Sequence, residues 1–489
     1  MGAKRQRKVV SDRTRSLIEN PKSKTQNQSA NDLLTALCSR FAEKRADVGV
    51  IGLGYVGVPL ALLFARSGFA TTGFDIDPEK VEKLERGETY IRHIAADAIA
   101  TVRKQERFRA TTDFARLRRM DAIIVCVPTP LDEHREPDLS YVCNTAESLR
   151  SHLRAGQLVV LESTTYPGTT EEVLLPILSR SGLRCAALPY ATDGHRVTAG
   201  DLAEVDFLLA FSPEREDPGN RSFQTHQIPK VIGGVNASSV RAAQALYQQV
   251  FERVILVSSS RAAEMTKLLE NIYRCVNIAL VNELKLLCLR MGIDIWEVIE
   301  AARTKPFGFT PFYPGPGLGG HCIPIDPFYL TWKAREYDFP TRFIELAGEV
   351  NTSMPGHVVA AVADALNRRQ QCLRGARILV LGVAYKKDID DPRESPAFPI
   401  IQLLQERGAH VDYHDPYFPN LPKMRRYHLP PMTAVEPTAE ALPSYDAVVI
   451  ATDHSSYDYA HIVRHAKLVM DTRNATHAVT EGRENVVRC

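Results

Sequence analysis

The sequence predicts an α/β protein with two doubly wound domains joined by a long central helix and a helical middle region. Short apolar runs typical of buried strands alternate with helical segments in the first half of the chain, and this alternation returns after Ala376. Between the two regions, from Ala262, about thirty residues carry apolar side chains at helical spacing, with no proline or glycine before Gly292. A helix of this length is expected to bridge two domains.

The composition is typical of a soluble globular protein with several domains. The chain has 489 residues, of which 44% are hydrophobic and 24% charged, and its formal net charge is +2. This length predicts roughly three domains. The small net charge gives no global field that would attract nucleic acid or a membrane surface. The longest apolar run, 51–65, contains three glycines and is too short to cross a bilayer, so we expect no membrane insertion.

Residues 1–45 are expected to form a basic, disordered arm, because Lys and Arg cluster at the start of the chain. Ordered structure is predicted from Ala46. The nine cysteines are scattered and form no Cys-x-x-Cys pair, which argues against a metal site and against a disulfide framework. Free thiols favour a cytoplasmic location.

The first α/β domain is predicted to span residues 46–258. DVGVI (47–51) has the pattern of a buried strand that breaks into a glycine-rich turn and then a helix. ATTGFDID (70–77) predicts the next strand, which returns parallel to the first. Other strand candidates in this domain lie at 122–128, 158–164, 230–234 and 253–258.

The central region is predicted to span 259–370 and the C-terminal domain 371–489. The long helix carries an apolar stripe that could pack within the chain or against a second copy: Met265, Leu268, Leu269, Ile272, Val276, Ala279 and Leu280. A loop region, 304–327, and more helix to about Leu366 follow. The strand candidates of the C-terminal domain lie at 376–385, 410–417, 446–454 and 467–474.

Gly52, Gly54 and Gly57 form a Gly-x-Gly-x-x-Gly pattern between the first strand and its helix. The first glycine allows a tight turn, the second lets a pyrophosphate approach the backbone, and the third lets the helix pack closely on the sheet. Asp75 lies 18 residues after Gly57 and is placed to accept hydrogen bonds from an adenosine ribose. A carboxylate there repels a 2′-phosphate, so NAD is the expected cofactor, and both α/β domains are predicted to be Rossmann-like.

Other residues near this turn are expected to contact the cofactor. Tyr55 and Val56 lie within the glycine pattern itself. CVPTP (126–130) ends another strand with a rigid turn, so Pro128 and Thr129 could border the nicotinamide half. Asp77 competes with Asp75 for the ribose, but its place before a proline favours a helix N-cap.

A single cysteine, Cys322, lies in the glycine- and proline-rich loop PGPGLGGHCIPIDP (314–327). A lone cysteine is most often a small buried hydrophobic residue. Here it follows two glycines closely and precedes Asp326 by four residues. Beside a nicotinamide cofactor, its thiolate could trap an aldehyde as a thiohemiacetal, and a second hydride transfer would give a thioester that water hydrolyses.

Eight motifs, in their sequences and in their order along the chain, resemble those of the nucleotide-sugar 6-dehydrogenases, the family of UDP-glucose and GDP-mannose dehydrogenases. They are GLGYVG, CVPTP, ESTTYPGTT, SPERE, KLLEN, GPGLGGHCIPIDP, GVAYKKDIDDPRESP and DTRN, and they cover about residues 46 to 475. The resemblance implies NAD-dependent, two-step oxidation of a sugar C6 alcohol to a uronic acid, as in polysaccharide biosynthesis. It also implies a homodimer or larger homo-oligomer formed through the central helix.

The resemblance also implies roles for individual residues. Cys322 matches the nucleophile, and Lys267 and Asn271 match the pair that supports the C6 oxygen. Asp326 matches the acid that assists proton transfer. The other matches are a carboxylate and a hydroxyl near the water and the thioester, Glu214 and Thr164.

Substrate contacts are expected from Lys267, Asn271, Glu214 and Gly319. In the C-terminal domain, the resemblance places Lys386 and Arg473 near the nucleotide, and Arg393 near the cofactor, across the domain boundary. Ordinary surface salt bridges are the alternative for these three basic residues.

Two departures from the UDP-glucose pattern bear on the substrate. His321 precedes the cysteine where a serine is usual, and Ile325 precedes the aspartate where a lysine is usual. These changes resemble the branch that oxidises UDP-N-acetylhexosamines, and UDP-N-acetylglucosamine is the best match. UDP-N-acetylmannosamine, UDP-glucose and a catalytically silent nucleotide-sugar-binding regulator are the alternatives.

Overall fold

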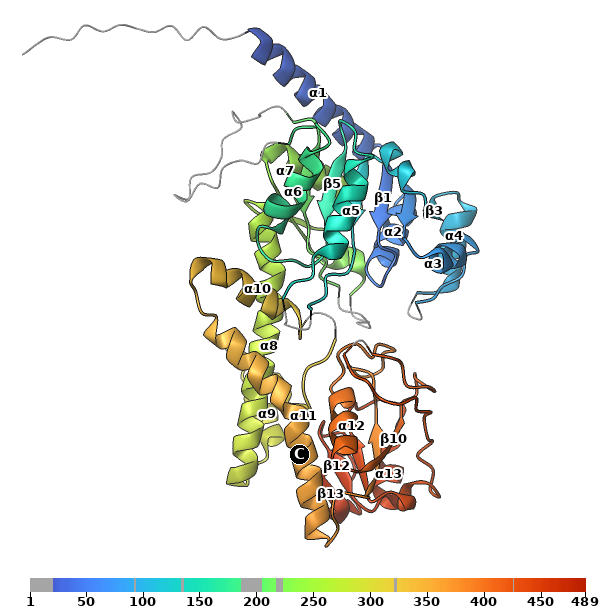
Figure 1. Cartoon of the computed structure of the whole chain (residues 1–489), viewed down its shortest axis with the longest axis vertical. Coiled ribbons are helices and arrows are strands. Elements are labelled where there is room, and N and C mark those ends of the chain that lie inside the picture. The colour runs from blue at the N-terminus through green and yellow to red at the C-terminus, as the bar shows by residue number, and fades with distance from the viewer. Residues whose placement is uncertain are drawn as a thin grey trace, which may run out of the picture.

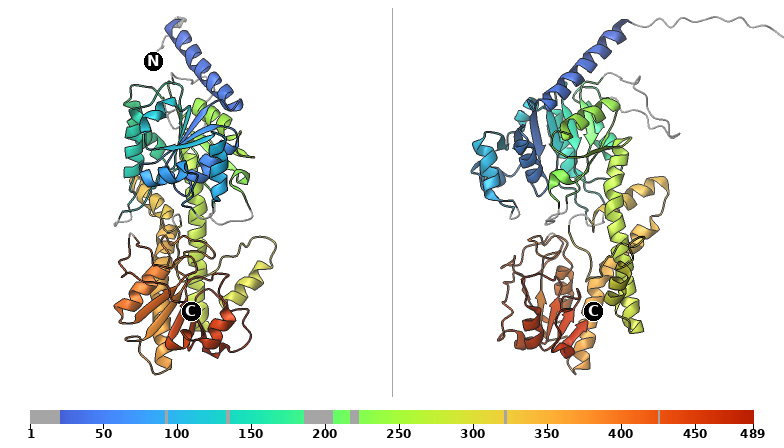
Figure 2. Two further views of the ribbon diagram at one scale, coloured as in Figure 1. Left: turned by 90° about the vertical axis from the view of Figure 1, so that its right-hand side faces the viewer. Right: turned by 180° about the vertical axis from the view of Figure 1, so that it is seen from behind.

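The computed structural model describes residues 21–91, 94–132, 136–185, 205–216, 223–320, 323–424 and 426–489. Two α/β domains lie at opposite ends of a long helix, α8, and a second long helix, α11, packs beside it (Figure 1). Figure 2 shows the same separation of the two domains from two other sides. Within the described ranges, no helix is both long enough and apolar enough to cross a membrane.

The N-terminal sheet contains eight strands in the order β3-β2-β1-β4-β5-β6-β7-β8. Its strands are β1 (Asp47–Ile51), β2 (Ala70–Phe74), β3 (Phe108–Thr111), β4 (Ala122–Val125), β5 (Leu158–Leu161), β6 (Leu208–Phe211), β7 (Lys230–Gly234) and β8 (Val254–Leu256). The first six strands have the 3-2-1-4-5-6 order of a dinucleotide-binding fold. The strand order reverses between β1 and β4, and ligands of such sheets bind there, beyond the carboxyl ends of the strands.

Apolar clusters lie on both faces of this sheet, so its central strands are buried on both sides. The helices of the domain are α2 (Gly57–Arg66), α3 (Pro78–Glu85), α4 (Ala96–Lys104), α5 (Ser140–Arg150), α6 (Leu175–Ser179) and α7 (Ala237–Tyr247). Strand β7 is antiparallel to β6, with Phe211 opposite Gly233. This reversed direction brings the start of β7 to the edge where the parallel strands end.

Helix α1 (Pro21–Ala42) corrects the expectation of a disordered arm up to residue 45. Leu34, Leu37 and Phe41 are buried, and the helix packs against α7. Arg40 forms an ion pair with the buried carboxylate of Asp121. The apolar residues between positions 34 and 41 recur at helical spacing, which is the pattern of an amphipathic helix. The prediction of disorder rested on the basic charge of the segment and did not use this pattern. Residues 1–20 lie outside the described part of the chain.

The central region consists of α8 (Ser260–Met291), α9 (Ile295–Arg303), α10 (Asp326–Ala334) and α11 (Arg342–Arg368). Helix α8 begins after the N-cap Ser259, whose side chain accepts from the Ala262 N–H, and ends at Gly292 in the left-handed conformation. Leu268 and Ala279 of the apolar stripe are buried within the chain.

The C-terminal sheet contains five parallel strands in the order β10-β9-β11-β12-β13. They are β9 (Arg377–Leu381), β10 (His410–His414), β11 (Ala447–Ile450), β12 (Val469–Asp471) and β13 (Val486–Arg488), and the helices of this domain are α12 (Ala397–Glu406) and α13 (Tyr459–His465). The predicted fold class of two doubly wound α/β domains joined by a long helix is confirmed. Strands β3, β6 and β13 were not predicted. Arg109 interrupts the short apolar pattern of β3, and β13 offers only two apolar residues before Arg488. Strand β6 is a four-residue run that its pattern alone does not distinguish from helix.

Candidate active site

The glycine-rich turn at the end of β1 has the shape of a phosphate cradle. Gly52 has φ +92°, and a Cβ on it would lie 2.6 Å from the Cys126 carbonyl oxygen. A Cβ on Gly57 would lie 1.9 Å from the Gly52 carbonyl oxygen, so only glycine fits there, directly after Val56 at the start of α2. Gly54 instead faces open space, because a Cβ on it would meet no atom within 4 Å. The cradle therefore leaves room at Gly54 for a pyrophosphate, which a bound dinucleotide requires.

Asp75, which follows β2, holds this turn in place. Its carboxylate accepts from the Leu53 N–H at 2.8 Å and from the Asp77 N–H at 3.0 Å. The competing residue, Asp77, caps α3 by accepting from the Glu79 N–H at 2.9 Å. Asp77 therefore serves as the helix N-cap, whereas Asp75 fixes the turn that was predicted to hold the cofactor.

The other predicted cofactor residues come from both domains. The Arg393 guanidinium of the C-terminal domain lies 4.9 Å from the centre of the Tyr55 ring, which places a cation against the glycine-rich turn. Thr129 is buried, and its carbonyl accepts from the Tyr329 hydroxyl at 2.7 Å. Its neighbour Pro128 is exposed.

Lys267 and Asn271 lie one turn apart on α8, and Asn271 contacts the start of α10. The Asn271 side-chain amide donates to the buried carboxylate of Asp326 at 2.5 Å. Burial raises the pKa of Asp326 to about 6, and the charge of Lys267 opposes that rise. This carboxyl group can therefore exchange a proton near neutral pH.

Glu214 belongs to a buried network of charges at the carboxyl edge of the N-terminal sheet. Lys230 at the start of β7 lies 3.1 Å from Glu214 and 2.8 Å from Glu162, which follows β5. The Tyr247 hydroxyl also donates to Glu162. Burial opposes the charge of Glu214, but Lys230 and Lys267 together hold its pKa below the usual value. Burial raises the pKa of Glu162, and the charge of Lys230 opposes that rise.

Lys267 connects the two carboxylates of the site. Its charge acts on Glu214 from the N-terminal domain and on Asp326 from the central region. The structure thus brings together four of the predicted catalytic residues, Lys267, Asn271, Asp326 and Glu214. An ammonium, an amide and two carboxylates suit the stabilisation of an oxyanion and the movement of protons.

Thr164 follows β5 and is half-buried. The segment after it is fixed to α8 by the buried Glu264, whose carboxylate accepts from the Gly168 N–H at 2.5 Å and from the Thr170 N–H at 2.9 Å. Glu264 lies one turn before Lys267 on the same helix. These hydrogen bonds attach the segment after Thr164 to α8, the helix that carries the predicted catalytic residue Lys267.

The loop after residue 314 lies between α9 and α10 in the chain and contacts the C-terminal domain. A Cβ on Gly319 would lie 2.5 Å from the Tyr385 Cβ, and the Gly320 N–H donates to the Arg393 carbonyl at 2.9 Å. Because a side chain at position 319 would collide with Tyr385, only backbone fits at this point of the domain boundary. Cys322 and its neighbour His321 lie outside the described residues.

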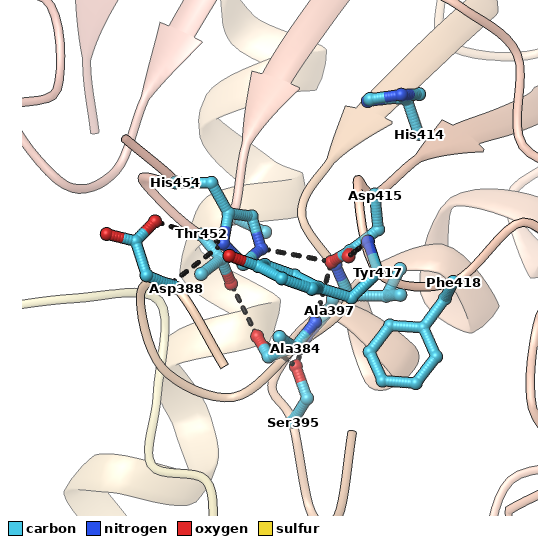
Figure 3. Close-up of polar contacts among 12 residues, drawn as sticks. Ala384, Asp388, Ser395, Ala397, His414, Asp415, Tyr417, Phe418, Thr452 and His454 are labelled. Atoms are coloured by element: carbon cyan, nitrogen blue, oxygen red, sulfur yellow. Dashed lines mark hydrogen bonds and ion pairs between the residues drawn. The ribbon is translucent and has the colours of Figure 1, made fainter. Parts of the chain in front are cut away.

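The C-terminal domain fixes the loop after β9 with a buried aspartate and a buried histidine (Figure 3). Asp415 accepts from the Val383 N–H at 2.7 Å and from the Ala384 N–H at 3.0 Å. Asp75 holds the turn after β1 in a similar way, through the Leu53 N–H. The two α/β domains therefore stabilise equivalent loops with the same chemistry.

His454 extends this network toward the surface. Its Nε2 lies 3.1 Å from the Asp415 carboxylate, and its Nδ1 accepts from the Asp388 N–H at 3.0 Å (Figure 3). The loop held in this way carries Lys386, whose side chain is exposed. The predicted substrate residue is thus presented on a fixed loop.

Arg473 follows β12 and packs against the loop of the central region. A Cβ on Gly315 would lie 2.5 Å from an Arg473 guanidinium nitrogen. The Arg473 Nε donates to the Ala451 carbonyl at 3.1 Å. Arg473 therefore contacts the loop region between the domains. The sequence resemblance predicted that Arg473 lies near the nucleotide at this domain boundary.

Sequence reasoning missed Lys230, Tyr247 and Glu264 as members of this site. A lysine at the start of a short strand ordinarily lies at the surface, and only the antiparallel pairing of β7 with β6 brings Lys230 beside Glu214. An acidic residue in the first turns of a helix is ordinarily explained by the helix dipole, so Glu264 carried no distinguishing signal. Tyr247 resembled any other aromatic residue of a core.

Three family models match the chain in order. They are the NAD binding, central and UDP binding domains of the UDP-glucose/GDP-mannose dehydrogenase family, at residues 46–251, 261–353 and 379–478. The NAD binding model covers the glycine cradle and Glu214, and the UDP binding model covers Lys386, Arg393 and Arg473. The central model covers the predicted catalytic residues of α8 and α10.

Similar proteins support the same assignment. UDP-N-acetyl-D-glucosamine 6-dehydrogenase of Pseudomonas aeruginosa is 34% identical over 85% of this chain and 92% of that protein. UDP-N-acetyl-D-mannosamine dehydrogenase of Escherichia coli K12 is 36% identical over 84% of this chain and 94% of that protein. The solved structure of UDP-D-ManNAc dehydrogenase from Pyrococcus horikoshii is similar with a TM-score of 0.76 at 32% identity, and covers 89% of this chain and 96% of its own. The chain belongs to the UDP-glucose/GDP-mannose dehydrogenase family and is an NAD-dependent nucleotide-sugar 6-dehydrogenase.

Proposed function

We propose that the protein oxidises the C6 alcohol of a UDP-N-acetylhexosamine to the uronic acid, with UDP-N-acetylglucosamine as the preferred substrate. The observation that carries this proposal is the convergence of Asn271, Asp326 and Glu214 around Lys267. Such a set supports an oxygen that becomes an alkoxide and later a tetrahedral oxyanion. The similar proteins are named for both N-acetylglucosamine and N-acetylmannosamine nucleotides, so the choice between these sugars rests on the sequence resemblance.

In the proposed mechanism, Lys267 and Asn271 hold the C6 oxygen, and Asp326 takes the proton that leaves the alcohol. Gly54 and Asp75 would hold NAD, and each of the two oxidation steps would need its own NAD as hydride acceptor, so NADH would be exchanged for a second NAD between them. Between these steps the thiol of Cys322 adds to the aldehyde carbon and holds the sugar as a thiohemiacetal. The resulting thioester is attacked by water, and the acid and the free thiol are released.

Glu214 is proposed as the base for that last step, with Thr164 near the thioester. Because Lys230 and Lys267 keep the Glu214 carboxylate charged, it can accept a proton from the attacking water. The proton lost by water is balanced by the proton that the departing thiolate regains. In this scheme the chain converts an alcohol to an acid without releasing an aldehyde.

A substrate panel tests the proposal. Purified protein is incubated with NAD and, in separate reactions, UDP-N-acetylglucosamine, UDP-N-acetylmannosamine and UDP-glucose, and NADH is followed by its absorbance. The highest kcat/KM is expected for UDP-N-acetylglucosamine. A higher value for either other sugar overturns the substrate assignment, and binding of every sugar without NADH formation would indicate a silent nucleotide-sugar-binding regulator.

We also propose that the protein forms a homodimer or larger homo-oligomer through α8. This helix exposes a row of large apolar side chains, which include Leu269, Tyr273, Leu280 and Leu287. Their spacing of four to seven residues places them along one side of the helix, where a second copy would cover them. A charge at the middle of the row, Leu280→Glu, should convert the oligomer to monomer in light scattering, and an unchanged mass would contradict this interface.

A further inference from the structure

The hydroxyl of Tyr329 joins two segments of the candidate site that lie 200 positions apart in the chain. Tyr329 belongs to α10 and is fully buried. Its hydroxyl donates to the Thr129 carbonyl at 2.7 Å and lies 3.2 Å from the Pro130 carbonyl. A tyrosine hydroxyl has one proton, and the Pro130 carbonyl already accepts from the Asp138 N–H at 2.9 Å, so the bond to Thr129 is the main one.

The turn at 126–130 depends on groups outside itself to keep its shape. It follows β4, and two of its five residues are prolines, which have no backbone N–H. The turn can therefore form few backbone hydrogen bonds of its own. Ser163 holds its first half by donating to the Val127 carbonyl at 2.8 Å, and Tyr329 holds its second half. The second of these bonds comes from the central region of the chain, not from the N-terminal sheet.

The other end of this connection is the helix that carries the predicted acid. Asp326 is the first residue of α10, and Tyr329 follows it three residues later, so the two residues are neighbours on the helix surface. The Asp326 carboxylate accepts from Asn271 of α8 at 2.5 Å. One short helix therefore contacts α8 through its first residue and the turn at 126–130 through its fourth.

Packing holds the ring of Tyr329 in place. The ring lies in an apolar cluster with Leu268 and Tyr166, which are also buried. Leu268 is the neighbour of Lys267 on α8, and Tyr166 lies two residues after Thr164. Side chains in such a cluster are closely packed and have little freedom, so the hydroxyl of Tyr329 is kept at the turn.

Hydride transfer depends on how closely the sugar carbon and the nicotinamide approach each other. The reaction needs the two atoms about 3–3.5 Å apart and aligned, and a displacement of about 1 Å can cost about 10²-fold in rate. Here the turn at 126–130 was predicted to border the nicotinamide, whereas the acid for the C6 alcohol was predicted at the start of α10. A bond between these two segments therefore bears on the rate of hydride transfer.

We propose that Tyr329 is a positioning residue for hydride transfer, whose hydroxyl keeps the turn at 126–130 at a fixed distance from the start of α10. The identity of the two reacting groups rests on the proposed function, whereas the bond itself is a feature of the structure. In this scheme Tyr329 acts through Thr129 and Asp326 and does not exchange a proton with the sugar. Burial raises the pKa of Tyr329, so its hydroxyl keeps its proton near neutral pH.

The test compares Tyr329→Phe with Tyr413→Phe, which removes a matched hydroxyl from the C-terminal domain. The Tyr413 side chain is also buried, and its hydroxyl donates to the Phe418 carbonyl at 2.9 Å. Both variants keep the ring and lose one hydrogen bond to a backbone carbonyl, so both should fold with a similar, small fall in melting temperature. Any further difference between them then reports on the site.

Hydride transfer is measured on the full chain as the first NADH formed in a single turnover, with saturating NAD and the UDP-sugar that gives the highest kcat/KM. We expect Tyr329→Phe to slow this rate by about tenfold or more, while the Kd of the UDP-sugar stays unchanged. Deuterium at C6 should slow the variant further, because the affected step is the transfer of that hydrogen. Tyr413→Phe should have the single-turnover rate of the unmodified protein.

Two results would overturn the inference. The first is an equal single-turnover rate in Tyr329→Phe and Tyr413→Phe, which would make the Tyr329 hydroxyl a purely structural group. The second is a slowed rate in Tyr329→Phe that deuterium at C6 does not change, which would place the defect in another step. If a sugar other than UDP-N-acetylglucosamine gives the highest kcat/KM, the substrate proposal fails, and the two variants are compared with that sugar instead.

Discussion

Lys230 lies 3.1 Å from Glu214, and both side chains are buried. The same ammonium lies 2.8 Å from Glu162, so one lysine serves two carboxylates at the same edge of the sheet. Removal of one member of a buried ion pair leaves the other charge without compensation, and this costs about 3–5 kcal/mol. Lys230 is therefore both a stabilising residue and a group that keeps Glu214 charged.

Replacement of Lys230 by Met should lower the free energy of unfolding by about 3–5 kcal/mol, because two buried carboxylates lose the one cation within hydrogen-bonding distance in the described part of the chain. Glu162→Gln is the matched variant, since it leaves the pair between Lys230 and Glu214 intact and should cost less. Denaturant unfolding measures both. Equal destabilisation by the two substitutions would contradict a lysine shared between the carboxylates.

Gly54 and Gly57 should respond differently to the same added methyl group. Gly57→Ala places a Cβ 1.9 Å from the Gly52 carbonyl oxygen, so the turn cannot keep its shape and the melting temperature should fall. Gly54→Ala meets no protein atom within 4 Å, so the fold should persist while the methyl group occupies the space of the pyrophosphate. We expect an unchanged melting temperature and a KM for NAD raised about tenfold or more in Gly54→Ala. A normal KM for NAD in that variant would place the cofactor elsewhere.

Arg393 should contribute to cofactor binding from the opposite domain. Its guanidinium lies 4.9 Å from the centre of the Tyr55 ring and is held by a salt bridge to Asp391 at 2.6 Å. Arg393→Ala removes the cation from the glycine-rich turn and should raise the KM for NAD by about two- to thirtyfold, if the contact contributes about 0.5–2 kcal/mol. Tyr55→Phe keeps the aromatic face and should have a smaller effect. If Arg393→Ala changed only the KM for the UDP-sugar, Arg393 would belong to the substrate site.

Asp326 should set the acid limb of the activity profile. Burial raises its pKa to about 6, and only the ionised form can accept the proton of the C6 alcohol, so kcat/KM should fall as the pH drops through about 6. Asp326→Asn should lower kcat by about 10²–10⁴-fold and remove this step from the profile. An acid limb that persists at the same pH in Asp326→Asn would assign it to another group.

The same carboxyl group should affect stability in the opposite sense. Its pKa in the folded protein, about 6, lies above the usual 3.8, so the folded state binds the proton more tightly than the unfolded state. The stabilising contribution is therefore complete below pH 3.8 and is lost as the pH rises through about 6. Unfolding measured between about pH 4 and pH 7 should show a smaller decline of stability in Asp326→Asn than in the unmodified protein.

The strand and helix pattern of the chain was largely predictable because it depends on local residue order. The glycine turn, the N-cap Asp77 and the C-cap Gly292 each follow from residues within a few positions of one another. Helix α1 shows the limit of local patterns. The basic charge of residues 1–45 predicted disorder, although part of this segment also has an apolar face. Its burial depends on α7, about two hundred positions along the chain.

The candidate site was predictable only where a motif marked it. Lys267, Asn271 and Asp326 were identified by resemblance, and the structure brings Asn271 and Asp326 into contact. Lys230 carried no such mark. It reaches its carboxylates through the antiparallel register of β7, and this arrangement is not encoded in local sequence.

Cys322 is the residue on which the proposed mechanism depends most, because its sulfur holds the half-oxidised sugar. The most direct measurement is mass analysis of reactions quenched during turnover of Glu214→Gln, in which slow hydrolysis should let the acyl group accumulate. We expect an acyl adduct on the peptide that contains Cys322, and in the unmodified protein two NADH for each uronic acid formed. Absence of any adduct, together with normal steady-state turnover of Cys322→Ser, would contradict the thioester route.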